Sequence, residues 1–84
     1  MIKVRVYGKS DCSLCTKALG ILKHLQDEFG LAVEYVDITG DGALYDRYRA
    51  RIPVVCREGR EIASGIVTTP GLRQVLRGTG AARG

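Results

Sequence analysis

The hydrophobic pattern of the chain switches between the period of a strand and the period of a helix. Residues 2–7 alternate apolar and polar side chains and end at Tyr7-Gly8, which predicts a strand that enters a turn. Beyond Ser13 the apolar side chains follow helical spacing as far as Gly30, a residue suited to end a helix in the left-handed conformation. They are Leu14, Ala18, Ile21, Leu22, Leu25 and Phe29. The pattern therefore predicts a strand, a polar loop and a long helix.

The second half of the chain predicts shorter elements. They follow in the order strand, helix, strand and strand, over residues 31–38, 43–50, 52–56 and 61–66. Residues 57–60 are suited to a tight hairpin turn between the last two strands. Thr69 and Pro70 open a last helix that continues through Leu76, with Thr69 as its N-cap and Pro70 at its first position.

This order of elements, βαβαββα, is that of an α/β protein. Because strand–helix–strand crossovers are right-handed, the first two strands should be parallel neighbours. The hairpin then adds an antiparallel pair, which gives a four-stranded mixed sheet flanked by helices on both faces, in three layers. We predict one domain over residues 1–77 and a flexible C-terminal tail over residues 78–84, which contains no core-forming side chains.

Composition and charge argue against several classes of function. The 84 residues contain no apolar run as long as the roughly 18 residues that a membrane span needs. They also contain no continuous apolar block of about 7–15 residues such as a secretory signal needs. We therefore expect a cytoplasmic protein without membrane contact. Separately, we expect it to be a monomer. The net charge is +4, and basic residues are concentrated only from Arg47 to Arg51. This segment is either a solvated basic face or a docking site for an acidic partner. No aromatic residues interleave with a basic stripe in a known nucleic-acid-binding motif, which argues against nucleic acid as a partner.

The candidate chemistry lies in Cys12-Ser13-Leu14-Cys15, at the first turn of the long predicted helix. Two cysteines three residues apart at a helix start face the same way and can close a disulfide. The unpaired N–H groups and the dipole of the helix favour an anion near Cys12, which lowers the pKa of its thiol and activates it. Cys15 lies one turn deeper and is suited to resolve a mixed disulfide.

Other residues have plainer interpretations. A closed metal site needs about four ligands, and His24 lies roughly 13 Å beyond Cys15 on the same helix, so we predict no intramolecular metal site. His24 is expected to be an exposed or half-buried helix residue. Cys56 follows apolar neighbours in a predicted strand and is expected to fill the core, with a third redox thiol as the alternative. Asp11 either raises the pKa of the Cys12 thiol or caps the helix and points away.

The arrangement strand–loop–Cys-x-x-Cys–helix, followed by Ile52-Pro53 before a third strand, resembles the thioredoxin superfamily. Length and topology are similar to those of glutaredoxins, and Tyr45 to Val54 resembles a bacterial glutaredoxin-like branch with a Cys-x-Leu-Cys dithiol. The resemblance implies a thioredoxin fold and a cis proline at Pro53, opposite the dithiol. It also implies that the backbone of Ile52 receives a cysteine-containing substrate, with Tyr7 and Lys9 near the mouth of the site.

The resemblance implies a thiol–disulfide oxidoreductase with Cys12 and Cys15 as catalytic residues and no cofactor besides the disulfide. Its partners would be a disulfide-containing protein substrate or glutathione, and a reductase. Ser13 and Leu14 replace the Pro-Tyr pair of typical glutaredoxins, and residues 64–69 lack the Gly-Gly-acidic sequence that grips glutathione. The alternatives are a redox-responsive binding domain and an iron–sulfur cluster carrier bridged between two chains.

Overall fold

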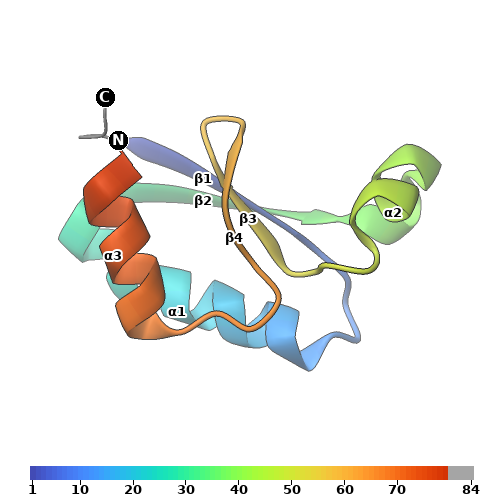
Figure 1. The fold of residues 1–84 in the computed structure, drawn as a ribbon, viewed down its shortest axis with the longest axis horizontal. Helices are drawn as coiled ribbons and strands as arrows, with labels where there is room; N and C mark the ends of the chain where they lie inside the picture. The colour runs from blue at the N-terminus through green and yellow to red at the C-terminus, as the bar shows by residue number, and fades with distance from the viewer. Residues whose placement is uncertain (80–84) are drawn as a thin grey trace.

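A computed structural model describes residues 1–79, and the predicted order of elements is confirmed within them. Figure 1 shows the elements along the chain. They are β1 (Ile2–Gly8), α1 (Ser13–Phe29), β2 (Leu31–Asp37), a 3-10 turn η1 (Ile38–Gly40), α2 (Gly42–Tyr48), β3 (Val54–Arg57), β4 (Arg60–Ser64) and α3 (Thr69–Thr79).

The four strands form one mixed sheet in the order β2-β1-β3-β4, as predicted. β1 and β2 run parallel, with Ile2 beside Leu31 and Gly8 beside Asp37. β3 pairs antiparallel with both β1 and β4. In this arrangement the carboxyl end of β1, which leads to the cysteines, lies beside the start of β3.

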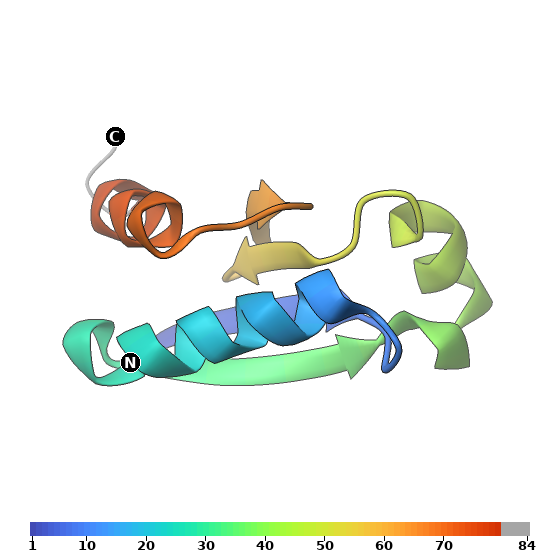
Figure 2. The same ribbon diagram turned by 90° about the horizontal axis from the view of Figure 1, so that it is seen from below.

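The face of the sheet under α1 and α3 holds the larger core (Figures 1 and 2). Val4 and Val6 of β1 meet Leu22 and Leu25 of α1, and all four side chains are buried. Burying one such side chain completely contributes about 1.5–3 kcal/mol. An exposed ion pair between Glu28 and Arg73, with an Oε2–Nε distance of 3.1 Å, joins the two helices, and Arg73 lowers the pKa of the Glu28 carboxyl.

Among the described residues 1–79, the opposite face of the sheet is covered only at one end. The seven-residue helix α2 lies there, and its Tyr48 packs with Ile38, Val54 and Cys56 in a second, smaller cluster. The predicted third layer is therefore partial. Beyond α2 this face of the sheet is hollowed by an open groove of about 410 Å³, lined by residues that include Arg5, Glu34 and Glu58.

Local signals explain where the elements begin and end. Gly30 ends α1 with φ 64°, and its N–H donates to the carbonyl of Gln26, as predicted for a left-handed cap. β3 begins at Val54 rather than at Ile52, since Pro53 has no N–H for the ladder. β4 ends at Ser64 because Gly65 turns to φ 70° and donates its N–H to the Pro53 carbonyl at 2.9 Å.

Three expectations at the last helix were wrong. The cap is Thr68 and not Thr69, because the Thr68 Oγ1 accepts the Gly71 N–H at 3.1 Å. Pro70 is therefore the second helical residue and not the first. The helix also continues through Gly78 to Thr79, two residues into the predicted tail. The rest of that tail, residues 80–84, lies outside the described residues. Within residues 1–79, no helix is long and apolar enough to span a membrane.

Candidate active site: the Cys12–Cys15 pair

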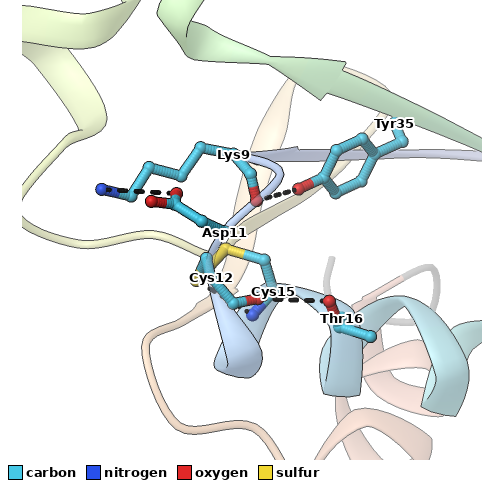
Figure 3. Close-up of a disulfide and its surroundings, with 6 residues drawn as sticks. All are labelled: Lys9, Asp11, Cys12, Cys15, Thr16 and Tyr35. Carbon is cyan, nitrogen blue, oxygen red and sulfur yellow. Dashed lines mark hydrogen bonds and ion pairs between the residues drawn. A yellow bond between two sulfur atoms is a disulfide. The ribbon is translucent and has the colours of Figure 1, made fainter.

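Cys12 and Cys15 lie at the N-terminus of α1, and their sulfur atoms form a disulfide (Figure 3). Their Cα atoms are 5.2 Å apart, inside the range that a disulfide spans without backbone movement. Cys12 is the N-cap of α1, with extended backbone at φ −112° and ψ 110°. Its Sγ accepts the Cys15 N–H at 3.1 Å. A sulfur at this place therefore meets one of the N–H groups that a helix start leaves unpaired.

The two sulfurs differ in their access to solvent. Cys12 is half-buried, whereas Cys15 has no exposed surface. Cys15 packs against Gly8 at the end of β1, so closely that a Cβ on Gly8 would lie 2.9 Å from the Cys15 Sγ. An incoming disulfide can therefore reach Cys12 first, and Cys15 lies behind it.

The loop between β1 and α1 is held from the side of β2 (Figure 3). The Tyr35 hydroxyl donates to the Lys9 carbonyl at 3.0 Å, and burial of Tyr35, followed by the charge of Asp37, raises the pKa of that phenol. The Lys9 ammonium lies 3.8 Å from a carboxylate oxygen of Asp11. Asp11 is thus exposed and paired with Lys9, and it does not cap the helix.

Pro53 lies at the same end of the sheet as the disulfide. The Ile52–Pro53 peptide is cis, as the resemblance implied. Val54 pairs with Tyr7, and continuing the antiparallel register by one residue puts Pro53 beside Gly8. Within residues 1–79, the backbone N–H and C=O of Ile52 make no hydrogen bond. The structure thus leaves a backbone donor and acceptor unused next to the buried proline.

Tyr7 is placed differently from the other candidate site residues. Its side chain lies on the face of the sheet opposite α1, where its ring stacks on Tyr48 with centroids 4.5 Å apart. Arg5 Nη1 donates to its hydroxyl at 3.4 Å. Tyr7 therefore anchors α2 to the sheet beside the site.

The family model for the glutaredoxin-like domain (DUF836) matches residues 3–77, nearly the whole chain. The chain belongs to the glutaredoxin-like domain family. No curated protein sequence matches it significantly. The match agrees with the resemblance drawn from the Cys-x-Leu-Cys sequence and Ile52-Pro53.

Solved structures confirm the thioredoxin fold of this glutaredoxin-like domain. The X-ray structure of target protein XcR50 from X. campestris is 32% identical, covering 88% of this chain and 95% of that one, with a TM-score of 0.77. The solution structure of protein Ne2328 from Nitrosomonas europaea is 27% identical over 87% and 88% of the two chains, with a TM-score of 0.74. A thioredoxin mutant from Halobacterium salinarum, 18% identical over 90% and 72%, shares the fold with a TM-score of 0.66.

The remaining cysteine and histidine lie apart from the disulfide. Cys56 is buried in β3 within the smaller cluster, as predicted for a core residue. Burial, followed by the charge of Glu61, raises the pKa of its thiol. His24 is exposed on α1. Within residues 1–79, no three His, Cys, Asp or Glu side chains are grouped so that they could hold a metal ion.

Two features of the site were not predicted from the sequence. Gly8 was placed in a turn, but its close approach to Cys15 was not foreseen. Tyr35 was assigned only to a strand, although its hydroxyl holds the loop that carries Cys12. The Tyr35 hydrogen bond joins residues 26 positions apart, and the Gly8–Cys15 contact depends on how the loop between them folds back. The local sequence pattern predicts neither contact.

Proposed function

We propose that this glutaredoxin-like domain is a thiol–disulfide oxidoreductase that reduces disulfides through Cys12 and Cys15. One observation carries the proposal: Cys12, half-buried at the N-cap of α1, accepts a backbone N–H at its sulfur, and the buried Cys15 lies directly behind it. A thiolate is the reactive form of cysteine, and a helix N-terminus stabilises it.

The reaction begins with the reduced dithiol. The Cys12 thiolate attacks one sulfur of the substrate disulfide, forms a Cys12–substrate disulfide and expels the other substrate sulfur as a thiolate, which takes a proton from solvent. Cys15 then loses its proton and attacks the Cys12 Sγ. The Cys12–Cys15 disulfide forms, and the second substrate sulfur leaves as a thiolate. Two electrons have passed from the protein dithiol to the substrate.

Substrate contacts follow from the residues around the sulfurs. The unused backbone groups of Ile52 can pair with an extended segment of the substrate next to its cysteine, while Pro53 excludes a ladder hydrogen bond at its own position. Lys9 lies in the loop just before Cys12, and Tyr7 supports the site from beneath α2.

The dithiol must be regenerated after each turnover. A reductase, or glutathione as a co-substrate, would supply the two electrons, and we place the activity in the reducing cytoplasm, in a monomer that needs no cofactor besides its own disulfide.

The test is disulfide reduction by a protein whose third cysteine is removed. In a Cys56→Ala background, with dithiothreitol as reductant, the protein should reduce insulin over many turnovers. Cys15→Ser in the same background, reduced, freed of dithiothreitol and mixed with insulin, should accumulate a covalent Cys12–substrate disulfide, visible by mass spectrometry. If the protein exchanges electrons once and then stops, it is a redox-responsive binding domain and the proposal is wrong.

A further inference from the structure

The second helix and its C-cap residue present two arginines and a tyrosine to solvent, at the end of the molecule that carries the loop before α1 (Figure 1). We use the name α2 basic face for Tyr45, Arg47 and Arg49, all of which are exposed; the two-residue spacing puts Arg47 and Arg49 on different sides of the helix, flanking Tyr48. The Arg47 guanidinium lies 5.5 Å from the centroid of the Tyr48 ring, and the Arg49 guanidinium lies 5.9 Å from that of Tyr45. These separations fall within the range of cation–π attraction, which restrains both long side chains over the rings.

The two guanidiniums of the α2 basic face differ from the next arginine along the chain in their hydrogen-bond partners. Arg51, the next arginine along the chain, forms an ion pair with Glu61 at 2.7 Å. By contrast, neither the Arg47 nor the Arg49 guanidinium has a hydrogen-bond or ion-pair partner among the described residues 1–79. A guanidinium that is restrained by a ring and has free donors is suited to bind a carboxylate in two-point fashion.

The α2 basic face lies next to the proposed point of substrate entry. Arg49 is three residues before Ile52, so their Cα atoms are at most roughly 10 Å apart. Tyr48 stacks on Tyr7, whose neighbour Gly8 contacts Cys15. Both views of the ribbon show α2 and the loop before α1 at the same end of the molecule (Figures 1 and 2). A substrate segment paired with the Ile52 backbone would therefore run close to Arg49 and toward the rest of the α2 basic face.

From this placement we infer that the substrates are proteins whose reactive cysteine has acidic residues within about three positions along the chain. The inference rests on the proposed function and names its substrate class. The chemical step is unchanged: two electrons pass from the Cys12–Cys15 dithiol to the substrate disulfide, and carboxylates of the substrate bind the α2 basic face while the mixed disulfide forms. The net charge of +4 adds a long-range attraction toward an acidic partner.

The experiment compares disulfide peptides that differ only in charge. The protein is reduced with dithiothreitol, freed of reductant and mixed with peptides that carry Glu, Gln or Lys on both sides of a disulfide-bonded cysteine. The second-order rate constant for the Glu peptide should exceed that for the Gln peptide about tenfold at low salt, in the range of electrostatic steering. The ratio should approach one at high salt, where the screening length falls to about 3 Å.

Two double variants that change the net charge by the same amount show whether the preference for the Glu peptide depends on Arg47 and Arg49. In Arg47→Glu/Arg49→Glu the Glu-to-Gln rate ratio should fall to one or below. In Lys23→Glu/Arg60→Glu, where the altered residues are exposed on α1 and at the start of β4, the ratio should stay above five at the same salt. Circular dichroism of both variants confirms that they fold.

The outcomes separate the inference from the function on which it rests. Equal rates for the Glu and Gln peptides, or a Glu preference that survives Arg47→Glu/Arg49→Glu, would overturn the acidic substrate class and leave the reductase activity standing. Failure to reduce any peptide would overturn both. Glutathione disulfide serves as a small acidic probe. If it reacts as fast as the Glu peptide with the same dependence on Arg47 and Arg49, the assignment to a protein substrate is wrong.

Discussion

Cys12 and Cys56 carry the same type of side chain, but they lie in two regions of the domain with opposite surroundings. Cys12 caps a helix, is half-exposed and accepts a backbone N–H at its sulfur. Cys56 lies in the middle of the sheet and is only 6% exposed, and burial raises the pKa of its thiol. The comparison shows that the position in the fold, and not the residue type, decides which thiol is available for chemistry.

Removing one thiol at a time tests most directly whether Cys12 and Cys56 differ in reactivity. Cys12→Ser should lose insulin reduction entirely, because the hydroxyl is not a nucleophile toward disulfides at neutral pH. Cys56→Ala should retain the wild-type rate. The assay is turnover with dithiothreitol as reductant. A Cys12→Ser protein that still reduces insulin would mean that Cys56 or Cys15 performs the reaction.

The next largest effect is expected from the packing of Gly8 against Cys15, and it concerns the stability of the fold. In Gly8→Ala the new Cβ would lie 2.6 Å from the Tyr35 hydroxyl and 2.9 Å from the Cys15 Sγ, so the loop or strand must shift. We expect a loss of about 1–3 kcal/mol in the free energy of unfolding. The measurement is urea denaturation of the oxidised protein.

The matched control for Gly8→Ala is Gly20→Ala, on the exposed side of α1. A Cβ there meets nothing within 4 Å, and we expect a gain of up to about 1 kcal/mol from helix propensity. If both glycine variants change the stability in the same direction, the close packing of Cys15 against Gly8 is not the cause.

The packing of Cys56 should appear as a pH-dependent stability. Its folded-state thiol pKa is raised, so its contribution to stability is fully present below the unfolded pKa of about 8.5 and is lost as the pH rises through the folded-state pKa. Cys56→Ala should cost about 1 kcal/mol at pH 7. Urea denaturation at pH 7 and pH 10 should show a smaller drop for Cys56→Ala than for wild type, and equal drops would contradict the raised pKa.

The smallest effect on stability is expected from loosening the loop that carries Cys12. Tyr35→Phe removes the hydrogen bond to the Lys9 carbonyl and should cost about 0.5–1.5 kcal/mol in the free energy of unfolding. The carbonyl keeps access to water, which limits the loss. A Tyr35→Phe protein with unchanged stability and an unchanged rate of Cys12 alkylation would show that the bond does not hold the loop.

Local patterns in the sequence predicted the parts of the fold that depend on local physics. The helical spacing after Ser13, the cap at Gly30 and the strand order all follow from periodicity, glycine conformation and crossover handedness. The dithiol at the start of α1 was predicted for the same reason. The N-cap of α3 was misplaced by one residue, since Thr68 and Thr69 are equally good caps and only the Gly71 N–H decides between them.

The rest depends on tertiary contacts that no short segment encodes. The stacking of Tyr7 on Tyr48, the hydrogen bond of Tyr35 and the partial cover of the second sheet face each join residues distant in sequence. A helix of seven residues is too short to cover the sheet, but its position at one end follows only from the packing of Tyr48.

The most direct measurement is the pH dependence of alkylation of the reduced protein, with Cys12 and Cys56 read separately by mass spectrometry. We predict that Cys12 reacts with a thiol pKa well below the ordinary value of about 8.5, while Cys56 reacts slowly and only at higher pH. An unshifted pKa at Cys12, or faster alkylation of Cys56, would contradict the proposal that the helix N-terminus activates Cys12 as the nucleophile.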